Sequence, residues 1–460
     1  MLMLRHLLAA VRRLLAPTLR PWTWSRSHNA GESVSQRRTI EARHDRGLEC
    51  ERIQHVVIDV PSGGSPGGSG CPDAAGRSGH LPGVDGARGI AALSVLVFHV
   101  FHRNGGGLGY GGAVISYGWL GVPLFFVLSG LLLYRPFAHA TITNSKLPSF
   151  RRYAWARVLR IYPAYWLVLL CTVPVLGRFA DSPRMWLTHG IEQAFLVQSW
   201  FSNDWAGLTP AWTLVIEITF YAVLPFLVLA GAMLARHAAT PRGRAVTLLL
   251  ALTPLIPFAF AYRHIAVLER SPAGLPGYID EFAIGMLLAV ALELPATRRA
   301  ASWAWVLGPA GVLAFVLAFE FKHSGPAMTN HVGMVFTLLA TVGFALVLGR
   351  VLLAGDRPTL IGSVLSWQPV VWLGTVSYGI YLWHWPVIYI VGGKGWHHGG
   401  WPLFAGRLAV VLAVTLTLAA ISWYALERRA LALKDGLQQP RTRVPSRFSP
   451  RQPRPTPTAQ

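Results

Sequence analysis

An arginine and a histidine stand within one strongly apolar segment, Pro82–Val100, with the sequence PGVDGARGIAALSVLVFHV. Arg88 and His99 are eleven residues apart. On a helix, their side chains point within roughly 20° of one direction, about 16 Å apart along the axis. An ionisable group inside a membrane helix is costly and indicates a functional site, and an imidazole can act there as a general base. A structural interpretation stays open, in which His99 bonds between helices and Arg88 anchors its helix at the membrane surface.

Two further arginines precede a second apolar segment, within Ser149–Trp166, SFRRYAWARVLRIYPAYW. Arg157 and Arg160 are three residues apart and therefore share one face of a helix. The planar guanidinium group donates two hydrogen bonds at once, which suits a phosphate ligand. The alternative is topological, because a basic cluster before a membrane span also retains that end of the span in the cytoplasm.

A polar stripe runs along the apolar segment Leu208–Leu227, LTPAWTLVIEITFYAVLPFL. Thr213, Glu217 and Tyr221 are spaced by four residues, so they share one helix face. A carboxylate in a membrane span must have a partner or be neutral. The arginine and the histidine of the first segment are the candidate partners, and a purely structural ion pair is the alternative.

A fourth segment, Trp372–Ile388, WLGTVSYGIYLWHWPVI, combines polar and aromatic side chains. Ser377, Tyr381 and His384 lie at positions i, i+4 and i+7, again on one helix face. Pro386 is expected to kink this helix. The face is predicted to contact a substrate, although the aromatic residues are also typical of a belt at the membrane interface.

Small residues occur in the segment Gly118–Phe137, GWLGVPLFFVLSGLLLYRPF. Ser129 and Gly130 permit two helices to approach closely, as small residues do at the interfaces of membrane helices. We therefore interpret this pair as a packing surface.

The composition indicates a polytopic membrane protein. Of the 460 residues, 53% are hydrophobic and only 13% are charged, whereas soluble globular proteins contain about 25% charged residues. Apolar runs of about 20 residues recur, which is the length of a membrane-spanning helix. The predicted fold class is all-α, a polytopic membrane helical bundle of about ten transmembrane helices. The predicted spans lie near residues 87–103, 119–137, 161–177, 211–235, 245–262, 277–294, 302–320, 330–349, 369–391 and 403–424.

The polar residues of segment 185–201 predict an interfacial or re-entrant helix there. The net charge of +21 fits the positive-inside rule better than nucleic acid binding. Much of the excess charge lies in the two tails, and the remaining Lys and Arg residues gather in alternate loops. With an even number of spans, this bias predicts that both termini are cytoplasmic. We expect a multi-pass protein of the cytoplasmic (inner) membrane, with the lipid bilayer as a partner.

The chain is expected to divide into three parts. Residues 1–80 form a basic N-terminal extension, either disordered or lying on the membrane surface as an amphipathic helix. Residues 81–430 contain the spans, and residues 431–460 form a disordered tail rich in Pro and Arg. The 3 cysteines have neither CxxC nor metal-ligand spacing. We therefore expect no disulfide framework and no metal. We also expect no bound cofactor.

Together, these segments resemble the acyltransferase-3 family of bacterial integral-membrane O-acyltransferases. The sequence DGARGIAALSVLVFH resembles the opening motif of the family, in which a basic residue is followed by a histidine. Five further segments resemble the later sequence blocks of the family and occur in the same order along residues 82–430. They are GVPLFFVLSG, RVLRIYPAYW, AWTLVIEITFY, FAIGMLLA and VSYGIYLWHWP. Several weak motifs in the right order are far more specific than any one of them.

The resemblance implies transfer of an acyl group, commonly acetyl, from acyl-CoA to a hydroxyl group. The acceptor would be a carbohydrate, a glycolipid or a glycosylated metabolite. His99 would be the essential histidine and Arg88 its basic partner. Arg157 and Arg160 correspond to the arginines of the family that precede the third span, and Glu217 corresponds to its glutamate.

Three features depart from the family's pattern. Pro123 stands where many members have aspartate, and Ile218 stands where many have a second glutamate. Neither acid can then be required here, and we expect the choice of acceptor to differ. Some members also carry an extracytoplasmic SGNH hydrolase domain, for which we expect no room after residue 424. Transfer is then expected to finish within the membrane domain or to involve a separate cell-envelope partner protein.

The implied mechanism places the phosphates of acyl-CoA on Arg157 and Arg160, with Arg88 nearby. His99 would act as general base on the acceptor hydroxyl or would carry the acyl group itself. Glu217 would orient or charge-balance the arginine or the histidine of the first segment. The expected substrate-binding residues are Asp85, Trp212, Tyr221, Ser377, Tyr381 and His384.

Two other classes of function stay open on the residues alone. A transporter or flippase of a glycolipid or small polar solute would also contain buried charges and a Pro-kinked helix. Transporters often contain internal repeats, and none is evident here. A sensor or assembly partner that binds glycan would tolerate the loss of Arg88 or His99. The resemblance favours an enzyme.

Overall fold

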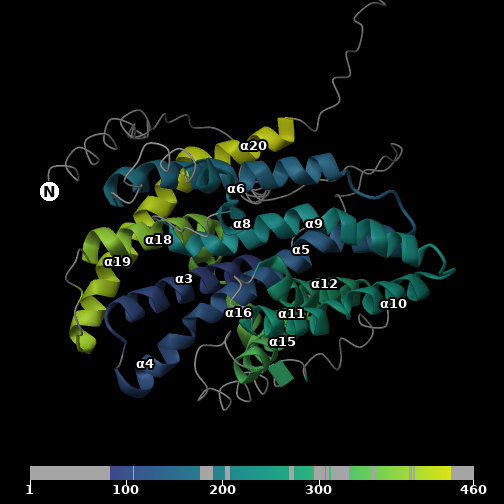
Figure 1. Ribbon diagram of the computed structural model, residues 1–460, viewed down its shortest axis with the longest axis horizontal. Helices are drawn as coiled ribbons and strands as arrows, with labels where there is room; N and C mark the ends of the chain where they lie inside the picture. Colours follow the sequence, from purple (N-terminus) through teal and green to yellow (C-terminus); the bar gives the residue numbers. More distant parts are fainter. Residues whose placement is uncertain are drawn as a thin grey trace, which may run out of the picture. The chain divides into compact units, whose positions relative to one another are not determined.

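A computed structural model describes the chain over residues 83–106, 108–176, 190–201, 208–268, 274–294, 306, 310–311, 331–354, 359–392, 396 and 399–436. All of these residues belong to one of the two units into which the chain divides, Leu81–Gln460. The expectations for residues 1–80, for most of 302–320 and for 437–460 lie outside the described residues. Within those residues every regular element is helical, which confirms the predicted all-α class (Figure 1).

The longer helices follow one another along the chain with short elements between them. They are α3 (Val84–Arg103), α5 (Gly121–Thr143), α6 (Phe150–Leu176), α9 (Trp212–Ala235), α10 (Pro241–Leu252), α11 (Leu255–Leu268), α12 (Ile279–Glu293), α15 (His331–Leu353), α18 (Ser377–Gly392) and α19 (Trp401–Ser422). The shorter elements are α4 (Gly109–Ile115), η3 (Ser116–Leu120), α8 (Gln198–Phe201), η4 (Thr209–Ala211), η5 (Leu275–Gly277), α16 (Leu360–Leu365), α17 (Gln368–Thr375), the π-helical turn η8 (Trp423–Glu427) and α20 (Arg428–Gly436).

Among the described residues, six helical stretches are long and apolar enough to cross a membrane. They are Val84–Arg103, Gly111–Thr143, Thr209–Ala235, Pro241–Ile265, Gly333–Leu353 and Trp401–Leu433. The predicted number of ten spans is not confirmed. Near the predicted spans 161–177, 277–294 and 369–391 the chain is helical, but these helices are not both long enough and apolar enough to cross a membrane.

The three remaining spans differ for separate physical reasons. The helix α6 is 27 residues long, but its first half contains several arginines. The helix α12 has only 15 residues, and the predicted span 369–391 consists of two helices of 8 and 16 residues, α17 and α18. A straight helix needs about 20 apolar residues to cross the hydrocarbon core.

The helices α5 and α12 make the most extensive helix–helix contact of the described residues. A Cβ atom at Gly130 of α5 would collide with the carbonyl oxygen of Phe282, and one at Gly285 of α12 would collide with that of Val127. Small residues allow membrane helices to pack backbone against backbone in this way. This contact confirms the packing role that the sequence predicts for Gly130.

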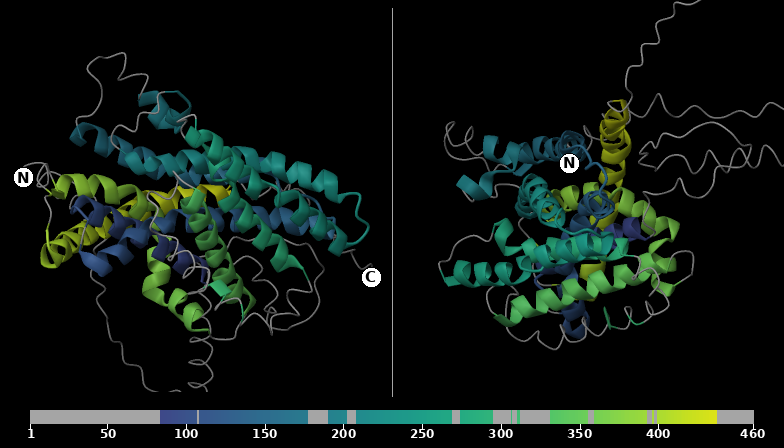
Figure 2. Two further views of the ribbon diagram at one scale, coloured as in Figure 1. Left: turned by 60° about the horizontal axis from the view of Figure 1, so that its bottom comes forward. Right: turned by 90° about the vertical axis from the view of Figure 1, so that its right-hand side faces the viewer.

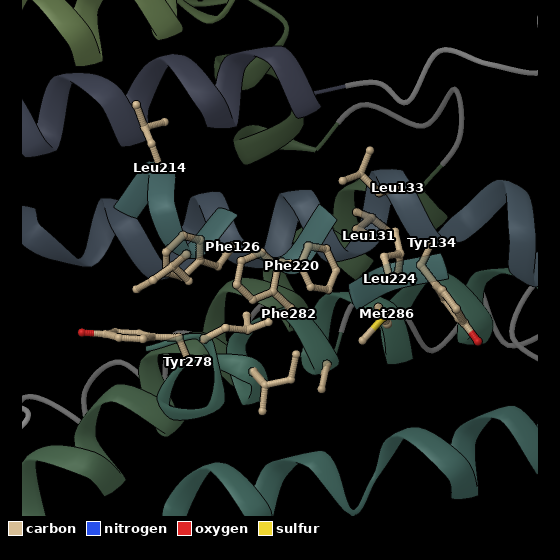
Figure 3. Packing of buried hydrophobic residues seen from close by; sticks show 14 of the residues in the cluster. Phe126, Leu131, Leu133, Tyr134, Leu214, Phe220, Leu224, Tyr278, Phe282 and Met286 are labelled. Carbon is tan, nitrogen blue, oxygen red and sulfur yellow. The ribbon is translucent and has the colours of Figure 1, made fainter. Parts of the chain in front are cut away.

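Three stacked phenylalanines join α5, α9 and α12 in the core (Figure 3). The ring centroids of Phe220 and Phe282 are 4.0 Å apart, and those of Phe126 and Phe282 are 4.6 Å apart. None of the three side chains is more than 2% exposed. Stacked pairs of this kind contribute about 0.5–1.5 kcal/mol beyond the burial of their area. They hold α5 and α9, which line the candidate site, against α12.

The helix α3 packs against α17 and α18. Figure 2 shows the helices from two further directions. Gly89 permits the close approach, because a Cβ atom there would lie 2.7 Å from the backbone nitrogen of Gly374 and 2.8 Å from the carbonyl oxygen of Val370. The helix of Arg88 and His99 is therefore fixed beside the helix of Ser377–His384.

A buried ion pair joins α11 to α12. Arg263 donates hydrogen bonds of 3.1 and 2.7 Å to the two carboxylate oxygens of Asp280, and one of 2.7 Å to the carbonyl oxygen of Gly277. The arginine is 3% exposed and the aspartate 1% exposed. Removal of one partner from such a pair costs about 3–5 kcal/mol, because a buried charge is left uncompensated.

Candidate functional site

A cavity of about 790 Å³, including its open part, lies between α3, α5, α6, α9 and α18. Apolar residues of α5 form much of its wall. Its polar lining consists of Arg88, Ser129, Arg157, Arg160, Thr213, Glu217, Tyr221, Ser377, Tyr378 and Tyr381. Five helices that are far apart in the sequence thus place polar residues in one space.

Three arginines face this cavity without a carboxylate at ion-pair distance among the described residues. The Nε atoms of Arg88 and Arg157 are buried and have no hydrogen-bond partner there. The guanidinium group of Arg157 lies 5.8 Å from the ring centre of Tyr221, and that of Arg160 lies 6.0 Å from the ring centre of Trp423. An anion with several oxygen atoms would satisfy these groups, because each guanidinium can donate to two oxygens.

Glu217 is the carboxylate within the cavity, and its hydrogen bonds come from two neighbouring hydroxyl groups. Ser129 of α5 donates to Oε1 over 2.9 Å, and Tyr221, one turn further along α9, donates to the same oxygen. Its charge also acts on the guanidinium group of Arg88. These hydrogen bonds of Glu217 come from α5 and α9 and do not involve His99.

His99 lies outside the lining of the cavity, further along α3. Its Nδ1 atom is 2.9 Å from the carbonyl oxygen of Val95 and 3.3 Å from Nε2 of His384 on α18. The ring of Trp385 stands edge-on to the imidazole, with 5.1 Å between the ring centres. His99 and Arg88 are therefore held by the same helix but in separate surroundings.

Tyr381 stands between the two parts of the site. Its hydroxyl group donates to the carbonyl oxygen of Pro210 over 2.6 Å and lies 2.5 Å from the hydroxyl oxygen of Thr213. It lines the large cavity and also a smaller one of about 200 Å³, to which Trp385 contributes. Tyr381 thus contacts both the arginine-lined cavity and the smaller cavity beside Trp385.

The predicted substrate-binding residues fall into two groups. Tyr221, Ser377 and Tyr381 line the large cavity. Asp85 and Trp212 do not line it: Trp212 packs against Tyr278, with 5.4 Å between ring centres, and the backbone of Asp85 lies against Gly374. His384 is also outside the lining and contacts His99 instead.

Glu427 is a candidate site residue that sequence reasoning missed. It is 3% exposed, accepts a hydrogen bond of 3.1 Å from Ser422, and interacts electrostatically with Arg160 and Arg88. It ends the π-helical turn η8, and such turns occur frequently at functional sites. In the sequence this acid directly precedes Arg428 and Arg429, so it looks like part of a charged tail.

Ser129 and Tyr378 were also not predicted to line the site. Ser129 has the size of a packing residue, and nothing local shows that it faces a glutamate on another helix. Tyr378 is buried and donates a hydrogen bond of 2.9 Å to the carbonyl oxygen of Ile161. Within the described part of the chain, no group of three or more His, Cys, Asp or Glu residues could hold a metal ion.

Comparison with known proteins identifies the family and several relatives. The acyltransferase-3 family, described as an acyltransferase domain, matches residues 81–426. YrhL of Bacillus subtilis, whose assignment as a peptidoglycan O-acetyltransferase is provisional, is 29% identical over 76% of this chain and 54% of its own length. The peptidoglycan O-acetyltransferase OatA of Listeria monocytogenes is 25% identical over 67% of this chain and 49% of its own length.

The O-acetyltransferase OatA of Staphylococcus aureus is 24% identical over 76% of this chain and 57% of its own length. The chain thus spans about half the length of these curated relatives. No solved structure matches it. Six membrane-length helices in the described residues, together with these relatives, make it a multi-pass membrane protein.

Proposed function

The chain belongs to the acyltransferase-3 family, and from this premise we propose that it transfers an acyl group from acyl-CoA to a hydroxyl group of a cell-envelope carbohydrate. Acetyl is the acyl group to test first, and peptidoglycan the first acceptor, because the names of two relatives specify peptidoglycan O-acetylation. Glycolipids and glycosylated metabolites are further acceptors of the same chemistry.

The observation that carries the proposal is the set of three arginines around one cavity without ion-pair partners among the described residues. In the proposal, Arg157 and Arg160 bind the phosphates of acyl-CoA, and Arg88 lies further along the cavity toward the thioester. Arg88 shares its helix with His99, so the donor's reactive end is directed toward the histidine. Glu217 and Glu427 balance the arginine charges when no donor is bound.

In the proposed reaction His99 removes the proton from the acceptor hydroxyl. The acceptor oxygen attacks the thioester carbonyl, and the bond between the carbonyl carbon and the sulfur then breaks. The proton passes from His99 to the departing CoA thiolate, so the enzyme returns to its starting state. An acyl-histidine intermediate would divide the same transfer into two steps.

Tyr381 has a defined place in this proposal, because it lines both the arginine-lined cavity and the smaller cavity of Trp385, the residue that contacts His99. In the proposal the thioester approaches His99 beside Tyr381, whose hydroxyl group would contact the reacting carbonyl. Tyr221 and Ser377 are proposed contacts of the donor or acceptor within the large cavity. We assign no substrate contact to Asp85 or Trp212, because neither lines it.

The proposed topology places the arginine-lined opening at the cytoplasmic face, where acyl-CoA is made, in the cytoplasmic membrane. Arg151 and Arg152 are exposed near the start of α6, which fits the positive-inside rule. A separate cell-envelope protein would receive the acyl group if the final acceptor lies outside the membrane domain.

The proposal is tested with membranes that contain the parent protein, supplied with radiolabelled acetyl-CoA and a cell-wall and lipid extract. We expect the label to enter an alkali-labile ester of the acceptor, and we expect His99→Gln to abolish this transfer. The control variant is His102→Gln, because His102 is an exposed histidine on the same helix. An absence of transfer with acetyl-CoA and with longer acyl-CoA donors would contradict the proposal and would favour a transporter.

A further inference from the structure

His384 is a buried histidine whose contacts define its protonation. It is 0% exposed, and its Nδ1 atom is 2.6 Å from the carbonyl oxygen of Tyr381. A carbonyl oxygen can only accept a hydrogen bond, so Nδ1 carries the proton. In the neutral imidazole Nε2 is then an unprotonated acceptor, and a buried acceptor without a donor is costly.

The donor that faces this acceptor is His99. The Nδ1 atom of His99 lies 2.9 Å from the carbonyl oxygen of Val95, so it too carries a proton. The same Nδ1 atom lies 3.3 Å from Nε2 of His384. Its proton is therefore shared between the carbonyl oxygen and the second imidazole, and the two rings are 5.0 Å apart between centres.

This arrangement leaves Nε2 of His99 without a proton. We propose that His384 is a positioning residue for His99: it accepts the Nδ1 proton of His99 and so presents the unprotonated Nε2 atom to the acceptor hydroxyl. This inference rests on the proposed function. His384 takes the place that a carboxylate holds beside the histidine of a catalytic triad.

The role extends through the reaction. When His99 takes the acceptor proton on Nε2, the ring becomes positively charged, and its hydrogen bond to the neutral His384 strengthens. The proton then leaves from Nε2 of His99 to the CoA thiolate, and His384 gains and loses no proton. A side chain that only filled space at this position would not affect the step.

The test compares two replacements of His384 in the purified, membrane-reconstituted protein. His384→Phe retains an aromatic ring but removes the acceptor, whereas His384→Gln can place a carbonyl oxygen near the position of Nε2. We expect His384→Phe to lower kcat by about 10- to 100-fold, the worth of one hydrogen bond to a charged group. We expect the KM for acetyl-CoA to stay unchanged, because the arginines that bind the donor lie elsewhere.

His384→Gln is expected to recover most of the lost kcat, and the matched control His102→Phe to behave like the parent. Thermal unfolding of each variant shows whether the fold is retained. The proposal is overturned if His384→Phe has the parental kcat, or if both His384 variants lose kcat equally in proportion to lost stability. If the parent transfers no acyl group, the proposed function itself fails, which is a different result.

A second measurement does not depend on activity. Nitrogen-15 NMR of histidine-labelled protein distinguishes the two ring nitrogens, and the signals of His99 are identified by their loss in His99→Gln. We expect the Nδ1 atom of His99 to be protonated and its Nε2 atom to be unprotonated at neutral pH. The opposite tautomer would overturn the positioning role, whatever the enzyme is found to transfer.

Discussion

The hydroxyl group of Ser129 on α5 donates a hydrogen bond of 2.9 Å to the carboxylate of Glu217 on α9. The next residue, Gly130, faces in a different direction and lets α5 approach α12. Two consecutive small residues therefore have different tasks. Ser129 donates a hydrogen bond to the carboxylate of Glu217, and Gly130 allows close packing of α5, the helix that contains Ser129, against α12.

Loss of the hydroxyl groups around Glu217 is expected to impair transfer. Ser129→Ala and Tyr221→Phe each remove one donor to the carboxylate, and we expect each to lower kcat/KM by about tenfold. The double variant should lose less than the product of the two, because both donors act on one oxygen. Acetyl-transfer rates measure this effect, and Thr219→Ala on the same helix is the control. Parental rates in both single variants would refute a role for these donors.

Substitution of Gly130 is expected to destabilise the protein. Gly130→Ala places a Cβ atom against the carbonyl oxygen of Phe282 and must separate α5 from α12. We expect a loss of about 1–3 kcal/mol, as for an overpacked core. Gly406→Ala is the matched control, since a Cβ atom there meets no atom within 4 Å. Thermal unfolding in detergent compares the two, and equal stability of both variants would contradict the close packing.

Much of the fold follows from local sequence. Long apolar runs predict the helices, and Gly130 predicts a close contact, because a membrane interface needs small residues. The number of spans does not follow so directly. The helix α12 is short, and α17 and α18 are separate helices with Val376 between them. An apolar run in the sequence indicates a buried or membrane segment, but it does not show where the helix within that segment is interrupted.

The site was partly predictable for a related reason. Arg88 and Glu217 stand out because a charge in an apolar run is rare. Ser129 and Glu427 do not stand out, since a small residue and an acid in a basic tail are ordinary in sequence. His384 was predicted as a substrate contact, and only the packing of α18 against α3 shows that it meets His99.

The two arginines of α6 are expected to determine donor affinity. Arg157→Gln and Arg160→Gln should each raise the KM for acetyl-CoA about tenfold, with a smaller effect on kcat, because each removes a charge-assisted contact to phosphate. Arg151→Gln, at an exposed position on the same helix, is the control. With a CoA donor that lacks the 3′-phosphate, the increase in KM should be smaller for the variant whose arginine would contact that phosphate. An unchanged KM in both variants would exclude donor binding at this cavity.

The buried pair of Arg263 and Asp280 is expected to stabilise the fold. Asp280→Asn leaves the guanidinium group of Arg263 buried without its counter-charge, which costs about 3–5 kcal/mol. Glu293 is 6% exposed, but its partners Arg135 and His139 are 27% and 59% exposed, so Glu293→Gln should cost less, about 1 kcal/mol. Thermal unfolding ranks the two variants. A larger loss of stability in Glu293→Gln than in Asp280→Asn would contradict the expected contribution of the buried pair.

The central claim is that α3 contributes both to donor binding, through Arg88, and to the chemical step, through His99. It is tested most directly by measuring acetyl-CoA binding and single-turnover acetyl transfer on the same purified preparations of the parent, Arg160→Gln and His99→Gln. We predict that Arg160→Gln weakens binding, whereas His99→Gln binds the donor like the parent and transfers at least about 100-fold more slowly. Undiminished transfer by His99→Gln would contradict the account.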